Sequence, residues 1–264
     1  MDAMFLHRAT RRYLIDRFDA LSRRYAERDH DVTGPEAKRI HPRYNLVADI
    51  LEQVERLDPD DLPDTESLAE VLLTAAEVEQ PSDSLAGDDI EVQAVLDERE
   101  RYRSAVRTLP SRPDVQAAPL GYRRVLTADE SAAWRIAMQR RWGVENGAWH
   151  PMLAGPVPPG VLVLTDAAVW RTDGVEVVRR VVRELGCQRV VELREYGADY
   201  LLDVEMFSPQ YTGAEGLWTG LQDDWIAYAS HEGTVAFGGS LAGAIATNWP
   251  DLDRWRWRGW NDPV

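Results

Sequence analysis

Four carboxylates lie on two stretches of the chain that have the composition of neighbouring β-strands, residues 189–195 and 200–207. They are Glu192, Glu195, Asp203 and Glu205. Because side chains alternate between the two faces of a strand, Asp203 and Glu205 should share a face and meet Glu192 across the strand pair. Paired carboxylates can act as general acid and base or bind a metal ion. These carboxylates are the basis of the alternative hypothesis, a hydrolase-type enzyme. The same alternation is also typical of a solvent-exposed face on which Arg194 balances the acids, and we favour that interpretation.

The other residues that could carry chemistry follow no catalytic or metal-binding spacing. The five histidines are His7, His30, His41, His150 and His231. None lies in an H-x-x-x-H or H-E-x-x-H pattern, and no second cysteine accompanies Cys187, so a zinc site is not indicated. His231 and Glu232 form a His–acid pair in a predicted hairpin turn, which favours an exposed or capping turn residue. Phosphate-binding glycine motifs and the G-x-S-x-G motif do not occur in the sequence. We therefore predict no catalytic, cofactor-binding or metal-binding residue.

The charge of the chain restricts its partners. The formal net charge is −15, and the stretch 57–98 holds 14 acidic residues and no Lys or Arg. A strongly acidic surface repels phosphate, which disfavours nucleic acid as a partner. It attracts basic partners and speeds their encounter, although an acidic surface often serves solvation alone. Lys38 is the single lysine among 30 basic residues, a usage that suggests a GC-rich bacterial source.

The sequence also predicts a compartment. No apolar run approaches the roughly 20 residues of a membrane-spanning helix. The first 25 residues carry charges throughout, unlike the apolar core of a signal peptide. Cys187 has no partner for an internal disulfide, and we expect it to be a buried free thiol in a reducing cytosol. These features predict a cytoplasmic protein that does not enter a membrane.

The first 110 residues are predicted to be helical throughout. Apolar residues recur at helical spacing from Met1 to Glu27 among many arginines, which predicts a basic amphipathic helix packed on its own domain. A polar loop is expected from Asp29 to Tyr44, with Asn45 as the cap of the next helix. The same periodicity predicts three further helices, over 45–57, 65–76 and 90–106.

A change of composition follows this helical region. Residues 109–120 contain Pro110, Pro113 and Pro119 and are the best candidate for a linker. All ten tryptophans lie at or after Trp134, which supports two regions with different packing. We therefore expect a helical region over 1–110 and an α+β domain over 120–264.

The second region mixes strands and helices. Thr127 followed by Glu130 is a capping-box pattern that predicts a helix from Ala128 to about Trp142, ended by Gly143. Strands are predicted over 161–165, 189–195 and 200–207, with a helix over 175–185 and a loop over 208–220. Successive antiparallel pairings favour an α+β fold with a mainly antiparallel sheet and flanking helices.

The clearest local signal is a hairpin followed by a helix. Trp225 to Ala229 and Thr234 to Phe237 are rich in β-formers, and Gly233 lies where the turn needs positive φ. Gly238 and Gly239 let the chain turn before Ser240, a predicted N-cap of a helix that ends before Pro250. We expect one core to contain Trp225, Tyr228, Val235, Phe237, Leu241, Ile245, Val163, Val191, Leu202 and Val204.

The segment from Trp255 to Trp260 alternates tryptophan with arginine up to Arg258, after which Gly259 and Trp260 follow. Tryptophan and arginine are common anchors of protein interfaces. The alternation also suits an edge strand or tail whose tryptophans cover the sheet, and we favour this packing role.

The run from Asp224 to Gly239, followed by a helix and Trp249-Pro250, resembles the C-terminal ends of bacterial immunity-type proteins of polymorphic toxin loci. The resemblance covers about 30 residues and excludes the helical region. It implies an acidic cytoplasmic protein that neutralises a toxin by direct binding, with no catalytic residues. We therefore predict a non-enzymatic binding protein, an immunity-like inhibitor of a basic protein partner, and leave its oligomeric state open.

Overall fold

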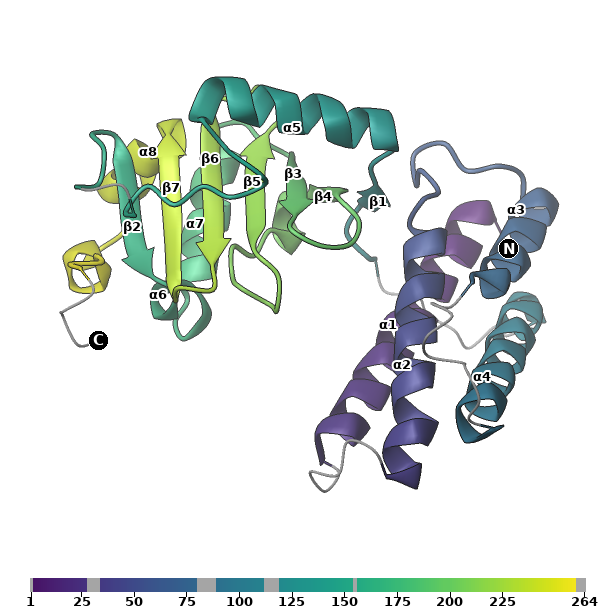
Figure 1. Cartoon of the computed structure of the whole chain (residues 1–264). Helices are drawn as coiled ribbons and strands as arrows, with labels where there is room; N and C mark the ends of the chain where they lie inside the picture. Colours follow the sequence, from purple (N-terminus) through teal and green to yellow (C-terminus); the bar gives the residue numbers. More distant parts are fainter. Residues whose placement is uncertain (1, 28–33, 80–88, 112–118, 154–155, 260–264) are drawn as a thin grey trace. The chain divides into compact units, whose positions relative to one another are not determined.

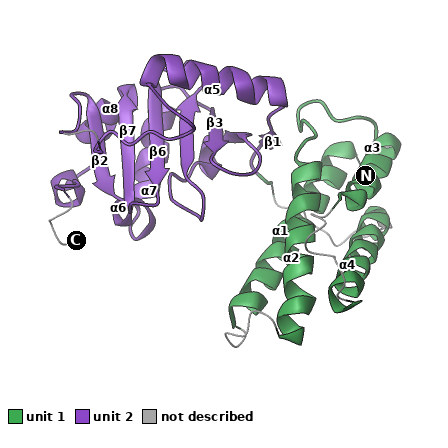
Figure 2. Cartoon of the chain, in the orientation of Figure 1, with its two compact units in different colours: residues 1–120 green, residues 121–264 purple. Residues whose placement is uncertain are grey.

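The chain folds into two compact units, 1–120 and 121–264, each considered by itself (Figure 2). The computed structural model describes residues 2–27, 34–79, 89–111, 119–153 and 156–259. The fold class is α+β, as predicted, with helices first and an antiparallel sheet with its own helices second (Figure 1).

Unit 1 is a layer of helices around one apolar core. Its helices are α1 (Ala3–Glu27), α2 (Pro35–Val54), α3 (Thr65–Thr74) and α4 (Asp89–Thr108), with short 3₁₀ turns at Ala75–Glu77 and Leu109–Ser111. The core includes Leu6, Leu14, Leu46, Ile50, Leu68 and Tyr102, all essentially inaccessible. The helix over 1–27 therefore packs on its own domain, as its apolar face predicts.

The predicted loop over 29–44 is wrong from Pro35 onward, because α2 begins there. Proline suits the first position of a helix, where its missing N–H would have no partner. Pro42 lies inside the helix and is buried, and the close packing of α1 on α2 holds this turn despite the lost hydrogen bond. Asn45 therefore lies in the middle of α2 and does not cap a helix. The N-cap of α3 is Asp64, which accepts hydrogen bonds from the amides of Glu66 and Ser67.

Unit 2 is built on a seven-stranded antiparallel sheet in the order β1-β4-β3-β5-β6-β7-β2. Its strands are β1 (Arg123–Val125), β2 (Val161–Thr165), β3 (Arg189–Arg194), β4 (Tyr200–Asp203), β5 (Gly216–Gly220), β6 (Trp225–Ser230) and β7 (Thr234–Gly239). Its helices are α5 (Ala128–Trp142), α6 (Ala167–Trp170), α7 (Gly174–Glu184) and α8 (Ser240–Asn248), with 3₁₀ turns at Val204–Met206 and Leu252–Trp255.

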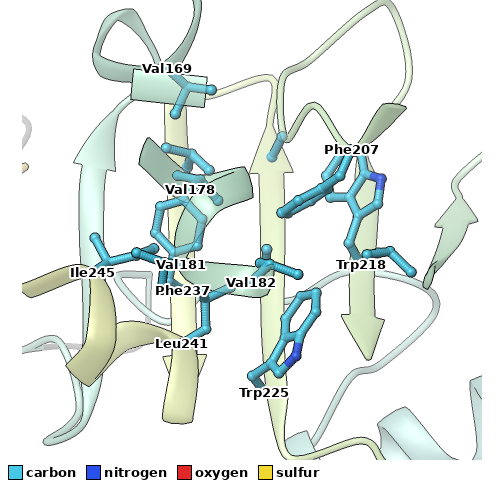
Figure 3. Packing of buried hydrophobic residues seen from close by; sticks show 14 of the residues in the cluster. Val169, Val178, Val181, Val182, Phe207, Trp218, Trp225, Phe237, Leu241 and Ile245 are labelled. Carbon is cyan, nitrogen blue, oxygen red and sulfur yellow. The ribbon is translucent and has the colours of Figure 1, made fainter. Parts of the chain in front are cut away.

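Helices cover both faces of this sheet, so the hairpin residues divide between two cores rather than one. Residues of α7 and α8 pack with Trp225 and Phe237 on one face (Figure 3). Leu202 belongs to the same core. Met138 of α5 packs with Tyr228 and other residues on the opposite face. Every residue predicted for the core around the hairpin is buried, but alternation along β6 and β7 places neighbouring residues on opposite faces.

Two predicted strand boundaries are wrong. The strand predicted over 200–207 ends at Asp203, and the chain continues as a 3₁₀ turn. The loop predicted over 208–220 contains β5, which lies between β3 and β6 in the sheet. Gly216 and Gly220 weaken the strand pattern, yet a Cβ at Gly216 would lie 2.3 Å from the ring of Trp218. Glycine at position 216 therefore makes room for a tryptophan.

The ends of α5 have the caps that the sequence predicts, whereas the N-cap of α8 differs from the prediction. Thr127 and Glu130 form the expected capping box, and Gly143 ends α5 in a left-handed conformation. The cap of α8 is Gly239 rather than Ser240, with φ of 69° and no room for a Cβ beside the Asp224 carbonyl. Ser240 instead donates its hydroxyl proton to Asp224 at 2.7 Å.

The described part of the tryptophan–arginine segment, which ends at residue 259, packs on the sheet. This is the packing role that its sequence favours. Arg256 forms an antiparallel bridge with Leu164 of β2, and the Trp257 amide donates to the Val163 carbonyl at 3.0 Å. Trp255 and Trp257 contact opposite cores. Trp260 lies outside the described residues. Among the described residues, no helix is both long and apolar enough to span a membrane.

Candidate functional site

Three connections meet at one end of the sheet in unit 2. They are the β3–β4 turn, the segment that leads into β5, and the β6–β7 turn. The register places Arg194 opposite Gly216 and Gly216 opposite Ala229, so residues that follow β3, precede β5 and follow β6 come together. This arrangement gathers side chains that are far apart in the sequence.

Glu215 lies at the centre of this end, immediately before β5. Its side chain is 7% accessible and accepts hydrogen bonds from the Tyr228 hydroxyl and from Nδ1 of His231, the latter at 2.5 Å. Nε2 of His150 lies 3.6 Å from the same carboxylate and 3.2 Å from the Tyr228 hydroxyl oxygen. A buried carboxylate requires such partners, because an unpaired buried charge is costly.

These contacts fix the charge state of the cluster. Burial, the Glu215 hydrogen bond and the Glu215 charge all raise the pKa of Tyr228, which therefore remains a donor. Burial works to raise the pKa of Glu215, but hydrogen bonds from Tyr228 and His231 outweigh it and hold the pKa below its usual value. The hydrogen bond to Glu215 raises the pKa of His231 above its usual value. Glu215 and His231 thus form an ion pair that persists to higher pH than an isolated histidine would allow.

A serine, a histidine and a glutamate occur in series here, but the geometry does not suit nucleophilic catalysis. Ser230 Oγ lies 3.5 Å from Nδ1 of His150, whose other nitrogen faces Glu215. Ser230 is fully buried, and its Oγ accepts a hydrogen bond from the Glu232 amide at 3.1 Å. A nucleophile must reach its substrate, and this hydroxyl is closed off beneath the turn. Ser230 and His150 therefore support the β6–β7 turn.

The outer side of the same end carries aromatic rings. Tyr196 is 67% exposed, Tyr211 is 42% exposed, and the His231 side chain is 58% exposed. The rings of Tyr211 and His231 are 6.4 Å apart. A hydrogen bond to Glu195 raises the pKa of Tyr196, with smaller contributions from the Glu195 charge and from Tyr211.

Two further carboxylates flank these rings. Glu195 accepts a hydrogen bond from the Glu215 amide at 3.2 Å, and Glu232 lies 3.2 Å from Nε2 of His231. We call Tyr196, Tyr211, His231, Glu195 and Glu232 the Tyr–His surface. It presents aromatic faces and negative charge at one place.

The carboxylates predicted to form a site are not brought together. Glu192 pairs with Tyr200, whereas Asp203 pairs with Arg189, and this register puts Glu192 and Asp203 on opposite faces of the sheet. Asp203 accepts a hydrogen bond from the Tyr122 amide at 2.7 Å and lies 3.8 Å from Arg189. Glu205 lies beyond the end of β4, largely exposed, 3.3 Å from Arg183. The fourth member, Glu195, belongs to the Tyr–His surface.

The remaining predicted positions have clear outcomes. His231 is the turn residue that the sequence indicates, but it is also ion-paired. Cys187 is free and only half-buried. The described residues contain no group of three or more His, Cys, Asp or Glu placed to hold a metal ion. Sequence reasoning missed Glu215, His150 and Tyr228 as a group, because the register of β5 and β6 brings Glu215 near Tyr228 and His150 reaches them from the segment before β2.

Comparison of the chain with protein-family models, with curated proteins and with solved structures returned no match.

Proposed function

We propose that this chain is a non-enzymatic binding protein for a basic protein partner and that the Tyr–His surface makes the contact. The observation that carries the proposal is the exposure of three aromatic rings above an ionised carboxylate network. Tyrosine supplies large contact area at low entropic cost and is enriched in protein interfaces. The faces of such rings attract arginine and lysine, and adjacent carboxylates bind the same groups by charge-assisted hydrogen bonds.

The network below the rings holds this surface in one conformation before binding. Tyr228 and His150 anchor Glu215 from beneath, and Glu215 in turn fixes His231. Preorganised side chains lose less conformational entropy when a partner binds. The buried side of the cluster thus serves recognition, although no partner touches it.

The charge of the chain favours the same class of partner. In the described part of the acidic stretch of unit 1, many carboxylates are exposed: Asp60, Asp61, Asp64, Glu66, Glu70, Glu77, Glu79, Asp89 and Asp97. A net charge of −15 accelerates the encounter with a positively charged protein. Long-range attraction of this kind requires no direct contact with unit 1.

A toxin inhibitor of the immunity type is the specific form that we propose. It rests on the resemblance of residues 224–250 to such proteins and on the acidic charge. An inhibitor of a toxin that enters the cell would act in the cytoplasm, where Cys187 stays reduced. The test is co-expression with the product of the neighbouring reading frame, and rescue of growth from a toxic product is the expected result.

Binding itself can be tested with purified protein. The captured partner should be basic, and its affinity should fall steeply as salt rises from about 0.01 M to about 0.15 M, because the Debye length shrinks from about 30 Å to about 8 Å. The double variant Tyr196→Ala/Tyr211→Ala should weaken binding roughly 30-fold or more, the effect of losing one interface hot spot. Leu221→Ala is the matched control, since Leu221 is 55% exposed at the opposite end of β5. Equal binding by the double variant and the control would refute the assignment of the surface.

A further inference from the structure

A hollow of about 490 Å³ lies beyond the end of β5, at the opposite end of this strand from the Tyr–His surface. The segment that follows α7 lines one side with Cys187 and Gln188, and the β5–β6 turn lines the other with Leu221 and Gln222. Cys187 is the single cysteine of the chain, and it is free and partly exposed. A thiol at the edge of an open hollow can be reached by small reagents from solvent.

The end of α7 fixes the position of this thiol. Gly186 has φ of 83°, and its amide donates to the Arg183 carbonyl at 2.9 Å. The Cys187 amide donates to the Val182 carbonyl at 3.2 Å. These two bonds form a Schellman motif, in which the residue after the glycine packs back on the helix. Cys187 accordingly packs against the core that contains Val182, so its side chain borders the interior as well as the hollow.

A buried hydrogen-bond donor lies beside the thiol. Trp225 is fully buried in the core that contains Val182 and Phe207 (Figure 3). Its indole Nε1 has no hydrogen-bond partner among the described residues. The position that a Cβ would take at Gly220 is 2.8 Å from this nitrogen and 3.1 Å from the Sγ of Cys187. The nitrogen and the sulfur therefore face the same small space beside Gly220.

The indole N–H lacks only an acceptor. A buried donor that has lost its hydrogen bonds to water is costly unless another group replaces them. The thiol does not replace them, because sulfur is a weak acceptor and Nε1 forms no hydrogen bond to it. An oxygen atom bound to Sγ would lie closer to Nε1 and would be a stronger acceptor. The structure thus favours an oxidised form of Cys187 in which the sulfur carries oxygen.

We propose that Cys187 is a site of reversible oxidation to a sulfenic acid and that the Trp225 indole stabilises the product. The Cys187 thiolate attacks one oxygen of hydrogen peroxide, so that an S–O bond forms and the O–O bond breaks. Hydroxide leaves and takes up a proton as water, and the sulfur has given two electrons to the peroxide. Nε1 of Trp225 then donates to the new oxygen. The thiol is the resting form in a reducing cytosol, and cellular thiols reduce the sulfenic acid back to it. This inference is independent of the Tyr–His surface.

Dimedone, a reagent that labels sulfenic acids, tests the oxidation in the full chain. After exposure to hydrogen peroxide, mass spectrometry of the folded protein should show a dimedone adduct at Cys187. Treatment with dithiothreitol before dimedone should abolish the adduct, because a sulfenic acid is reducible whereas a sulfinic acid is not. Cys187→Ser is the matched control and should form no adduct. Absence of the adduct from the folded wild type, or failure of dithiothreitol to prevent it, overturns the proposal.

The indole proton of Trp225 tests the hydrogen bond. NMR of isotopically labelled protein should show this proton shifted downfield by peroxide and restored by dithiothreitol, with its signal assigned from Trp225→Phe. The same treatment should leave the signal unchanged in Cys187→Ser. An unchanged indole signal in wild-type protein that carries the sulfenic acid overturns the role of Trp225, and this measurement requires no variant at position 225 to be stable.

Variants separate the hydrogen bond from packing. Trp225→Phe keeps an aromatic ring but removes the donor, so the sulfenic acid should react with dimedone roughly tenfold faster, the effect of losing one hydrogen bond. Gly220→Ala should act in the same direction, because its methyl group fills the space between Nε1 and Sγ. Trp170→Phe, at a tryptophan that is 50% exposed, is the matched control and should react as the wild type does. Equal rates in Trp225→Phe and Trp170→Phe overturn the assignment of the indole as the donor.

Discussion

The two units each bury a carboxylate against a cation, yet they do so in different surroundings. In unit 1 Glu55 pairs with Arg11 at 3.0 Å, and neither side chain is more than 3% accessible. In unit 2 Glu215 pairs with His231, whose side chain is more than half exposed. A fully enclosed pair must be complete, because loss of one partner strands the other charge without water. A pair with one exposed member can exchange that member for solvent or for another molecule.

The histidines beside these pairs show the same difference. Burial, with the nearby charge of Arg11, lowers the pKa of His7 to about 4. The hydrogen bond to Glu215 raises the pKa of His231. One ring is enclosed beside a cation, which favours its neutral form, whereas the other lies at the surface beside a carboxylate, which favours its protonated form. The polar cluster of unit 1 is closed to solvent, whereas the cluster of unit 2 is partly open to it, where we propose that it serves recognition.

Removal of Glu55 should have the largest effect on stability. Glu55→Ala leaves the Arg11 charge buried, which should cost about 3–5 kcal/mol. Far-UV circular dichroism during urea unfolding measures the loss of unit 1 helices. Tryptophan fluorescence reports on unit 2 alone, since all ten tryptophans lie there, and should be unchanged. The control is Glu52→Ala, which removes an exposed pair with Arg56 worth about 0–1 kcal/mol. Equal losses in both variants would mean that burial of the pair does not set the cost of removing its carboxylate.

Acid should destabilise unit 1 through His7. The folded pKa of about 4 lies below the unfolded value of 6.5, so the unfolded chain binds more protons between these values. Stability is therefore full above pH 6.5 and falls as the pH drops towards 4, by about 3 kcal/mol at about 1.4 kcal/mol per pKa unit. His7→Leu should remove most of this slope between pH 6.5 and 5, where few carboxylates titrate. An unchanged slope in that variant would place the acid sensitivity elsewhere.

Tyr228→Phe tests the buried side of the unit 2 cluster. It deletes one hydrogen bond to a charged acceptor with little change of volume, which should cost about 1.5–3 kcal/mol. Urea unfolding followed by tryptophan fluorescence measures the loss. Tyr196→Phe, at an exposed position, should change stability by less than about 0.5 kcal/mol. A negligible effect at Tyr228 would mean that Glu215 is held by His231 and His150 alone.

The smallest effect is expected at His231, where the readout is a pKa. Titration by NMR should give a pKa above that of an unstructured histidine, and Glu215→Gln should lower it towards that value. Because the folded pKa is the higher one, this contact contributes stability below pH 6.5 and loses it as the pH rises through the raised pKa. No change on substitution of Glu215 would separate His231 from the network.

Local sequence signals predicted those parts of the fold that depend on neighbouring residues. Thr127 and Glu130 cap α5, and Gly233 makes the β6–β7 turn with φ of 69°, because each acts within a few residues. The interior position of Pro42 depends on packing between α1 and α2, which local propensity does not contain. β5 was predicted to be a loop because of its glycines, but Gly216 makes room for the ring of Trp218 and Gly220 lies against the ring of Trp225.

The candidate site was less predictable for the same reason. Tyr228 and His150 are 78 positions apart and meet only across the folded sheet. The sequence predicted that Glu192 and Asp203 lie together, but the register of β3 and β4 places them on opposite faces of the sheet. A shift of the register by one residue would reverse the face, and local sequence patterns do not fix the register that closely. The sequence predicted that His231 lies in a turn, but its partner Glu215 lies in the segment 208–220, which was predicted to be a loop.

The bridge between Arg256 and Leu164 bears on edge-to-edge association of the sheet. β2 is an outer strand of the sheet, and the unused amides and carbonyls of such a strand invite another chain to add to it. The segment around Arg256 and Trp257 occupies that side of β2, while the other outer strand, β1, is only three residues long and carries Arg123 and Arg124. Truncation before residue 252 should therefore expose this side of β2 to pairing with another chain, and light scattering should show oligomers that grow with time.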